Sequence, residues 1–272
     1  MKIRSMQFDA VFIFHPTNRM HLSMFLAGIP NRVGWDRKLG FLLTQRYPHE
    51  KQNGCKHETE YNADLLRHCG FSVDELNVSL PYDAIKRSGV VELARRGIQS
   101  DERYFVFGLG TSCPSKQWPI ISFAEVARVL RREYPESHIC VLAAAGERRL
   151  TDEFDKVYEE RFLDLTGSLT LPEIIVFLKE HAAAFIGNDS GLGHIAAGLG
   201  IPTVVVFGRN DPGLSPVRWR PLGALSDFVH KPQDCETCVA HACKNDFACM
   251  TAVSPGEVWI AVHQVVEKRH TF

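Results

Sequence analysis

Short apolar runs that are rich in Val, Ile and Phe alternate with amphipathic stretches along most of this sequence. The clearest runs are residues 10–14, 104–110, 138–144, 183–187 and 203–208. Uninterrupted apolar runs of this length are typical of strands that are buried on both faces of a sheet. Apolar residues at helical spacing predict helices at 18–27, 57–69, 83–96, 122–133, 172–180, 190–199 and 256–268. This alternation predicts parallel α/β sheets joined by right-handed crossovers.

The 272 residues divide best into two domains of ordinary size. Residues 97–272 contain four of the five runs and predict a nearly complete doubly wound domain, closed by the last helix. Residues 1–96 contain one run and a short extended piece near 32–35, so we expect only part of a Rossmann-like domain there. Proline, glycine and half of the eight cysteines interrupt residues 209–250, which we expect to form a long, loop-rich excursion.

Composition argues against several classes of protein. With 45% hydrophobic and 23% charged residues, the chain can bury a core and is not expected to be disordered. A formal net charge of -1 gives no long-range field that would gather nucleic acid or an anionic bilayer. No apolar stretch reaches about 20 residues, and the first run is too short for a signal-peptide core. We therefore expect a soluble, cytoplasmic protein with reduced cysteines and no nucleic-acid partner.

The first candidate binding loop follows the apolar run at 104–110 and precedes the helix at 122–133. It contains Thr111, Ser112 and Lys116. Backbone N–H groups and hydroxyls at the end of a strand, with a lysine charge beside them, are suited to a pyrophosphate. The alternative is an ordinary turn with an incidental lysine, since small residues are common in turns. We expect Trp118, in the same segment, to belong to the core.

The second candidate loop follows the run at 183–187 and opens the helix at 190–199. It contains Asp189, Ser190 and Gly191, with His194 one turn further on. The amino terminus of a helix carries unpaired N–H groups and a partial positive charge, and small residues let an anion approach them. Asp189 or Ser190 could instead be only the helix cap, and His194 a core residue. Two such loops at the ends of strands in one sheet favour a ligand site.

A carboxylate and a cysteine cluster complete the candidates. Glu147 follows the run at 138–144 and could hold ribose hydroxyls, although it would also suit the first turn of a helix. Four cysteines are clustered as C-x2-C-x4-C-x5-C, with two histidines nearby; they are Cys235, Cys238, Cys243 and Cys249. This cluster is either a metal site or a cysteine-rich cap, and its later spacings match no familiar zinc module. We expect the other cysteines to be packing residues: Cys55, Cys69, Cys113 and Cys140.

Several segments together form a family pattern. In chain order they are LAGIPNRVGWDRKLGFLLT at 26–44, KHETEYNADLL at 56–66, GTSCPSKQWP at 110–119, AAGE at 144–147 and NDSGLGHIAAGLGIPTVVVFG at 188–208. On these segments the chain resembles glycosyltransferase family 9, the ADP-heptose:lipopolysaccharide heptosyltransferases, over nearly its whole length. It is closer to the heptosyltransferase II type than to the heptosyltransferase I type.

The resemblance implies a fold and a reaction. The fold would be GT-B, an α/β arrangement of two Rossmann-like domains, here with the first one incomplete. The enzyme would transfer a heptose or related sugar from an ADP-activated donor to the lipid A and core oligosaccharide acceptor. Transfer would invert the anomeric centre without a catalytic metal or another cofactor. The acceptor implies peripheral contact with the inner face of the inner membrane, through basic residues such as Arg19, Arg32 and Arg37.

The family pattern also implies roles for single residues. Lys116 and Asp189 would be catalytic, with Lys116 on the pyrophosphate and Asp189 facing the sugar and phosphates. The other donor-binding residues would be Thr111, Ser112, Glu147, Ser190, Gly191 and His194. The family's general base, an aspartate after a glycine in the first strand-to-helix turn, has no matching position in this chain. We therefore assign no base, and none of the site residues is assigned to a metal.

Three functions remain open on the sequence alone. The first is a glycosyltransferase of which this chain is a shortened form. The second is a donor-binding module that recognises a nucleotide sugar and transfers nothing. The third is a nucleotide-sugar epimerase of GT-B-like architecture, against which the ordered family pattern stands.

Overall fold

The chain consists of two compact units in the computed structural model, which describes residues 2–76, 78–83, 98, 101–235, 238 and 240–269. The units are residues 1–77 and 78–272. Most of the predicted helix at 83–96, and the predicted domain boundary after residue 96, lie outside the described residues. Each unit contains its own parallel sheet.

The first unit contains a three-stranded sheet in the order β1-β2-β3. Its strands are β1 (Ala10–Ile13), β2 (Asn31–Asp36) and β3 (Gln45–Pro48), and all of them run parallel. Its helices are α1 (Lys2–Ser5), α2 (Asn18–Leu26) and α3 (Glu58–Arg67), with short 3-10 turns η1 (Gly40–Leu42) and η2 (Lys51–Asn53). The predicted strand at 10–14 and the helices predicted at 18–27 and 57–69 are confirmed.

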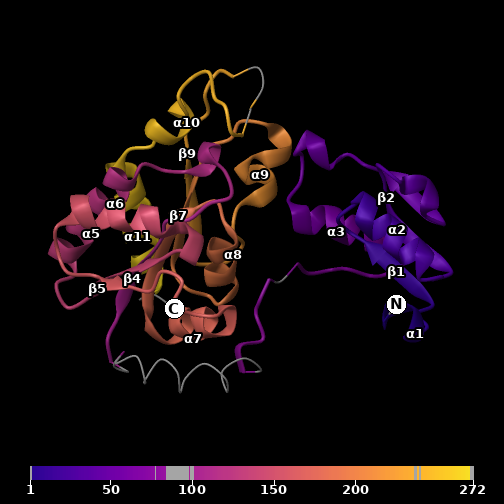
Figure 1. The fold of residues 1–272 in the computed structure, drawn as a ribbon, viewed down its shortest axis with the longest axis horizontal. Helices are drawn as coiled ribbons and strands as arrows, with labels where there is room; N and C mark the ends of the chain where they lie inside the picture. The colour runs from indigo at the N-terminus through magenta and orange to yellow at the C-terminus, as the bar shows by residue number, and fades with distance from the viewer. Residues whose placement is uncertain are drawn as a thin grey trace. The chain divides into compact units, whose positions relative to one another are not determined.

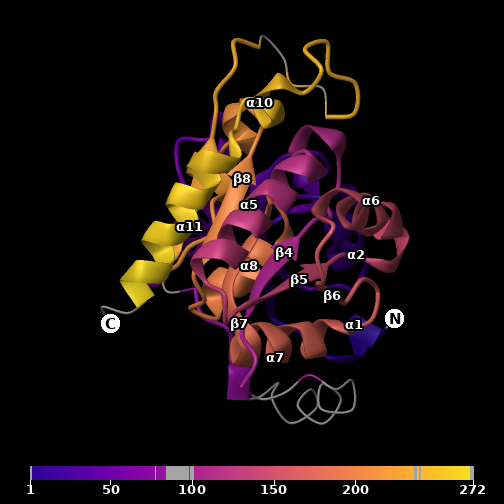
Figure 2. The ribbon, with the colours of Figure 1, turned by 90° about the vertical axis from the view of Figure 1, so that its left-hand side faces the viewer.

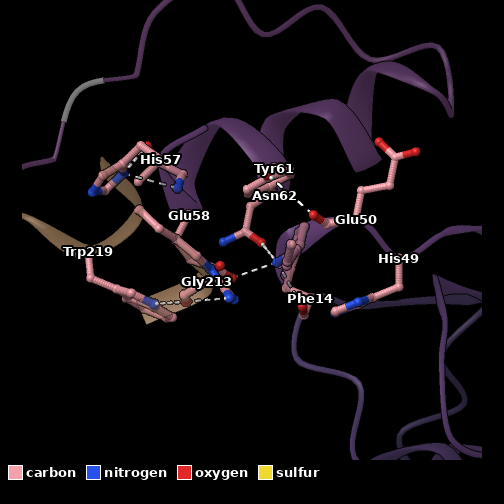
Figure 3. Close-up of polar contacts among 12 residues, drawn as sticks. Phe14, His49, Glu50, His57, Glu58, Tyr61, Asn62, Gly213 and Trp219 are labelled. Atoms are coloured by element: carbon pink, nitrogen blue, oxygen red, sulfur yellow. Dashed lines mark hydrogen bonds and ion pairs between the residues drawn. The ribbon is translucent and has the colours of Figure 1, made fainter. Parts of the chain in front are cut away.

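A buried lysine joins η2 to α3 within the first unit. The Lys51 side chain is 1% exposed, and its ammonium donates to the Glu58 carboxylate at 2.5 Å and to the Asn62 side chain at 2.7 Å. It also donates to the Phe14 carbonyl at 3.1 Å, and Figure 3 shows these groups converging. Removing one partner of a buried ion pair typically costs about 3–5 kcal/mol, because the other charge stays buried. The contacts therefore fix η2 on the helix.

The second unit contains a six-stranded parallel sheet in the order β6-β5-β4-β7-β8-β9. The strands are β4 (Tyr104–Gly108), β5 (His138–Leu142), β6 (Leu163–Asp164), β7 (Ala182–Asn188), β8 (Thr203–Phe207) and β9 (Ser226–His230). Counted within the unit, the order is 3-2-1-4-5-6, as in a Rossmann fold. The chain therefore reverses its direction of sheet growth between β4 and β7, which lie side by side at the centre of the sheet.

Helices cover both faces of this sheet, as Figures 1 and 2 show. Phe105 and Phe107 point to one face, where they share a core with α5 (Ile120–Glu133), α6 (Arg148–Tyr158) and α11 (Pro255–Arg269). Tyr104 and Val106 point to the other, where they pack with α7 (Leu171–His181) and α8 (Gly191–Gly198). Burial on both faces is the reason that these strands are continuously apolar in sequence. The predicted helices at 122–133, 172–180, 190–199 and 256–268 are confirmed.

Residues 209–250 contain more regular structure than the sequence predicts. The loop-rich excursion includes α9 (Pro216–Trp219), α10 (Ala248–Thr251) and the sixth strand β9, which pairs with β8. The prediction missed β9 because it is an edge strand of mixed composition in which every residue is only half-buried. It also missed the helix α6 and the two-residue strand β6. None of the described helices combines the length and apolar character needed to cross a membrane.

Candidate functional site

A cavity of about 960 Å³ opens at the carboxyl ends of the strands in the second unit. Residues that follow β4, β5, β6 and β7 line it, together with Leu214 and Trp219, whose indole donates to Gly213 (Figure 3). Ligands of open α/β sheets bind at this edge, beside the point where the strand order reverses. All eight predicted site residues line this one cavity: Thr111, Ser112, Lys116, Glu147, Asp189, Ser190, Gly191 and His194.

Lys116 and Asp189 meet across the cavity wall as an ion pair. The turn η3 (Pro114–Lys116) brings the Lys116 ammonium to 2.7 Å from the Asp189 carboxylate. The lysine side chain is 20% exposed and the aspartate 8%. An ammonium has three N–H donors, so one bond to Asp189 leaves donors that can point to an anion in the cavity. The aspartate thereby holds the lysine in place without consuming its capacity to donate.

The amino terminus of α8 faces the same cavity. Ser190 occupies the cap position and its hydroxyl makes no capping bond, so the first N–H groups of the helix are not satisfied by that side chain. No atom lies within 4 Å of the position that a Cβ on Gly191 would occupy. The hydroxyls of Thr111 and Ser190 are buried without a hydrogen-bond partner among the described residues. Buried hydroxyls of this kind are satisfied when a polar ligand is bound.

Glu147 braces two of the loops that form the cavity. Its Oε1 accepts a hydrogen bond from the Thr111 amide at 3.1 Å, and its Oε2 accepts one from the Ala144 amide at 2.8 Å. A Cβ on Gly110 would stand 2.1 Å from this carboxylate, so the close approach requires glycine there. The carboxylate keeps lone pairs for a further donor, because each oxygen accepts more than one bond. The sequence did not indicate this bracing contact.

Asn188, the last residue of β7, was not among the predicted site residues. Its side chain is fully buried, and its Oδ1 accepts from the Trp118 amide at 2.9 Å. Its Nδ2 donates to the Leu109 carbonyl at 2.8 Å. These bonds join the loop after β4 to the end of β7, which places Lys116 opposite Asp189. Trp118 is itself completely buried, as expected of a core residue.

Apolar side chains also line the cavity and form what we call its apolar wall. Its side chains come from the ends of β5 and β6 and from α7 and α8, namely Leu142, Leu165, Leu169, Leu171, Ile174, Leu192 and Ile195. The cavity therefore offers charged groups that are suited to an anion and apolar side chains that are suited to a flat, apolar group. These residues could not be predicted as part of a site, because leucine and isoleucine in an apolar run or a helical pattern indicate only burial.

The predicted packing role of the remaining cysteines is confirmed in part. Cys113 and Cys140 are buried and Cys69 is half-buried, whereas Cys55 is exposed, so the expectation is wrong for Cys55. In the part of the chain that the structure describes, no three His, Cys, Asp or Glu side chains already stand together at metal-ligand spacing.

Comparison with known proteins adds the family. The sequence model of glycosyltransferase family 9 (heptosyltransferase) matches residues 1–248. This chain belongs to that family. It is 24% identical over 237 residues to lipopolysaccharide heptosyltransferase 2 of Escherichia coli, a match covering 79% of this chain and 64% of that protein. It is 31% identical over 147 residues to lipopolysaccharide heptosyltransferase 1 of Pseudomonas aeruginosa, covering 53% of this chain and 39% of the relative.

Solved structures of the family share the fold. The structure of E. coli ADP-heptose lps heptosyltransferase II superposes with a TM-score of 0.77 at 20% identity, covering 99% of this chain and 80% of that one. E. coli heptosyltransferase WaaC with ADP-2-deoxy-2-fluoro heptose superposes with a TM-score of 0.65 at 17% identity, covering 98% of this chain and 75% of that one. The predicted GT-B fold is confirmed. The chain spans somewhat less than two thirds of the length of the E. coli relative that it matches in sequence.

The pKa of His194 should make the free energy of unfolding depend on pH. Burial lowers this pKa below 6.5, Asp189 raises it and Lys116 lowers it further, so the folded state holds the ring neutral at pH 7. The unfolded chain takes up the proton near pH 6.5, so the free energy of unfolding should fall as the pH drops below that value. We predict that His194→Gln reduces this slope by up to about 1.4 kcal/mol per pH unit. Urea unfolding between pH 5 and pH 7, roughly the range in which histidine titrates, measures it.

The matched control is His263→Gln, which changes an exposed histidine on α11 in the same unit. It should leave the slope close to that of the original chain. Equal slopes in the two variants would contradict the assignment of a half-buried, neutral His194.

Proposed function

We propose that this chain carries the donor site of a glycosyltransferase that moves a heptose, or a related sugar, from an ADP-activated donor to the lipopolysaccharide core. The observation that supports it most is the convergence of Lys116, Asp189 and the start of α8 on one cavity. A lysine charge and a helix amino terminus aimed at the same space stabilise a diphosphate. The names of the family relatives supply the heptose and the acceptor.

The donor can be placed in the cavity by the chemistry of its walls. The diphosphate would lie between Lys116 and the amides at Ser190 and Gly191, within reach of the unpartnered hydroxyls of Thr111 and Ser190. Ser112 lines the same end and would add a further hydroxyl. The ribose would donate to the free lone pairs of Glu147. The base would lie against the apolar wall, which offers flat contact area.

The proposed reaction is a single displacement at the anomeric carbon. The acceptor hydroxyl oxygen forms a bond to that carbon as its bond to the diphosphate oxygen breaks, which inverts the configuration. The leaving diphosphate gains negative charge, which Lys116 and the α8 amides would stabilise in place of a catalytic cation. Asp189 would orient Lys116, and it and His194 would face the sugar and the phosphates. A general base must accept the proton of the acceptor hydroxyl, and we assign that role to no residue of this chain.

The donor site predicts that Lys116→Ala weakens the binding of ADP by about 10- to 100-fold, since a charge-assisted hydrogen bond contributes roughly 1.5–3 kcal/mol. Isothermal titration calorimetry with ADP measures the change. Lys156→Ala is the matched control, because Lys156 lies exposed on α6 and does not line the cavity. Equal affinity in both variants would contradict the assignment of the site.

Incubation with ADP-heptose and a lipid A and core acceptor then separates the remaining functions. Release of ADP that depends on the acceptor supports transfer. Binding of ADP-heptose without turnover would identify a donor-binding module. Turnover of the donor without any acceptor would favour an epimerase or a hydrolase.

We also propose that the first unit meets the acceptor at the membrane surface, on the cytoplasmic side. Arg19 and Arg37 are exposed, as are the apolar side chains of Phe25, Leu26 and Phe41. Basic and apolar side chains exposed together suit an anionic lipid surface. Arg32 does not belong to this set, because its guanidinium donates to carbonyls of its own unit, including that of Leu42 at 2.8 Å.

Charge reversal tests the lipid contact. Because each basic residue near an anionic surface contributes about 1 kcal/mol, Arg19→Glu with Arg37→Glu should weaken binding to phosphatidylglycerol vesicles by at least about 10-fold. Sedimentation with vesicles at low salt measures binding. Arg132→Glu with Lys156→Glu makes the same charge change on helices of the second unit and should have a smaller effect. Equal losses in both double variants would refute a specific surface.

A further inference from the structure

Four cysteines line a second cavity, separate from the candidate donor site. The cavity has a volume of about 360 Å³, and the thiols that line it are those of Cys235, Cys238, Cys243 and Cys249. All four are free and half-buried. Cysteines in the C-x2-C-x4-C-x5-C pattern are necessarily close in sequence. Because all four line one cavity, their side chains also face the same space. None of the four lines the donor cavity, and Cys249 also packs against the hydrophobic core of the second unit.

Polar groups around the cavity suit thiolate sulfur. The Asn245 backbone amide donates to the Cys243 sulfur at 3.4 Å, and the Asn245 side-chain amide donates to the Cys235 sulfur at the same distance. N–H donors that point to sulfur stabilise its negative form.

Basic side chains line the same cavity. Arg209 and Lys244 both face it, and the Nε of Arg209 is buried without a hydrogen-bond partner among the residues that the structure describes. A divalent cation with four thiolates has a net charge of about -2, which these cations would offset. If the thiols were uncharged, burying the unpartnered guanidinium nitrogen of Arg209 beside them would cost free energy.

We propose that Cys235, Cys238, Cys243 and Cys249 bind one thiophilic divalent cation, Zn²⁺ or Fe²⁺, in a tetrahedral site. Four sulfur ligands are typical of these two ions and unsuited to Mg²⁺ or Ca²⁺. With metal–sulfur distances of about 2.3 Å, neighbouring sulfurs would be roughly 3.8 Å apart. The described cysteine side chains do not stand at this spacing, so metal binding would draw the four sulfurs together.

The location gives the ion a structural role. The Ser115 amide donates to the Ala240 carbonyl at 3.2 Å, so the cysteine segment is tied to the turn that bears Lys116. A Cβ on Gly208 would stand 2.4 Å from the Met250 sulfur and 2.6 Å from the Ser115 carbonyl, which shows how tightly α10 packs there. The ion would fix the cysteine-bearing segment in addition to the core contacts that Met250 and Cys249 make.

The test is the metal content of the full chain after expression in medium that contains both zinc and iron. We expect one equivalent of zinc or iron per chain to remain after gel filtration, and elemental analysis identifies which. Cys238→Ser and Cys243→Ser should each lose most of it, whereas Cys55→Ser, which changes an exposed cysteine outside the cluster, should retain it. Cobalt added to the original chain after its metal has been removed should give the absorption bands of tetrahedral thiolate coordination. This measurement uses no variant, so it does not depend on whether the cysteine variants fold.

Two results would overturn the proposal. One is metal below a tenth of an equivalent, roughly the level of adventitious binding, with no cobalt–thiolate bands in the original chain. The other is pairing of the four cysteines as disulfides in freshly purified protein under anaerobic conditions. Both measurements are independent of ADP binding. A negative result in either one would therefore not contradict the proposed donor site, and loss of ADP binding would not contradict the metal site.

Discussion

The side-chain amide of Asn188 joins the two loops on which the candidate donor site depends. It is fully buried, accepts from the Trp118 amide and donates to the Leu109 carbonyl. Both bonds lie in a dry interior, where an unmade hydrogen bond costs about 1–3 kcal/mol, so the loop after β4 has little freedom to move away from β7. Trp118 extends the connection, because its indole donates to the Val253 carbonyl just before α11. Lys116 is thereby held on a rigid frame.

The order of the strands explains why the polar residues gather where they do. Because all six strands of the second unit run parallel, the residues that follow them emerge at one edge of the sheet. The reversal between β4 and β7 leaves an opening there, since successive crossovers cover opposite faces of the sheet. Apolar residues from α7 and α8 line this opening, and Lys116, Asp189 and Glu147 supply charge to it. The same topology that buries the strands therefore creates the cavity.

The sequence predicted the central elements and missed the peripheral ones, for a physical reason. Strands such as β4 and β7 are buried on both faces, so burial alone determines their composition. The edge strand β9 is half-buried throughout, and its composition carries no such constraint. The candidate site residues could be predicted because small and charged residues directly after apolar runs are conspicuous. The bracing by Glu147 and Asn188 could not, because a hydrogen bond across 36 or 70 residues leaves no local pattern.

The most direct measurement is a crystal structure of the chain with ADP. We predict that the diphosphate lies between the Lys116 ammonium and the amides at the start of α8, with the ribose beside Glu147 and the base against the apolar wall. We also predict that the unpartnered hydroxyls of Thr111 and Ser190 acquire partners in the complex. ADP bound elsewhere, for example in the cavity lined by the four cysteines, would contradict the assignment of the donor site.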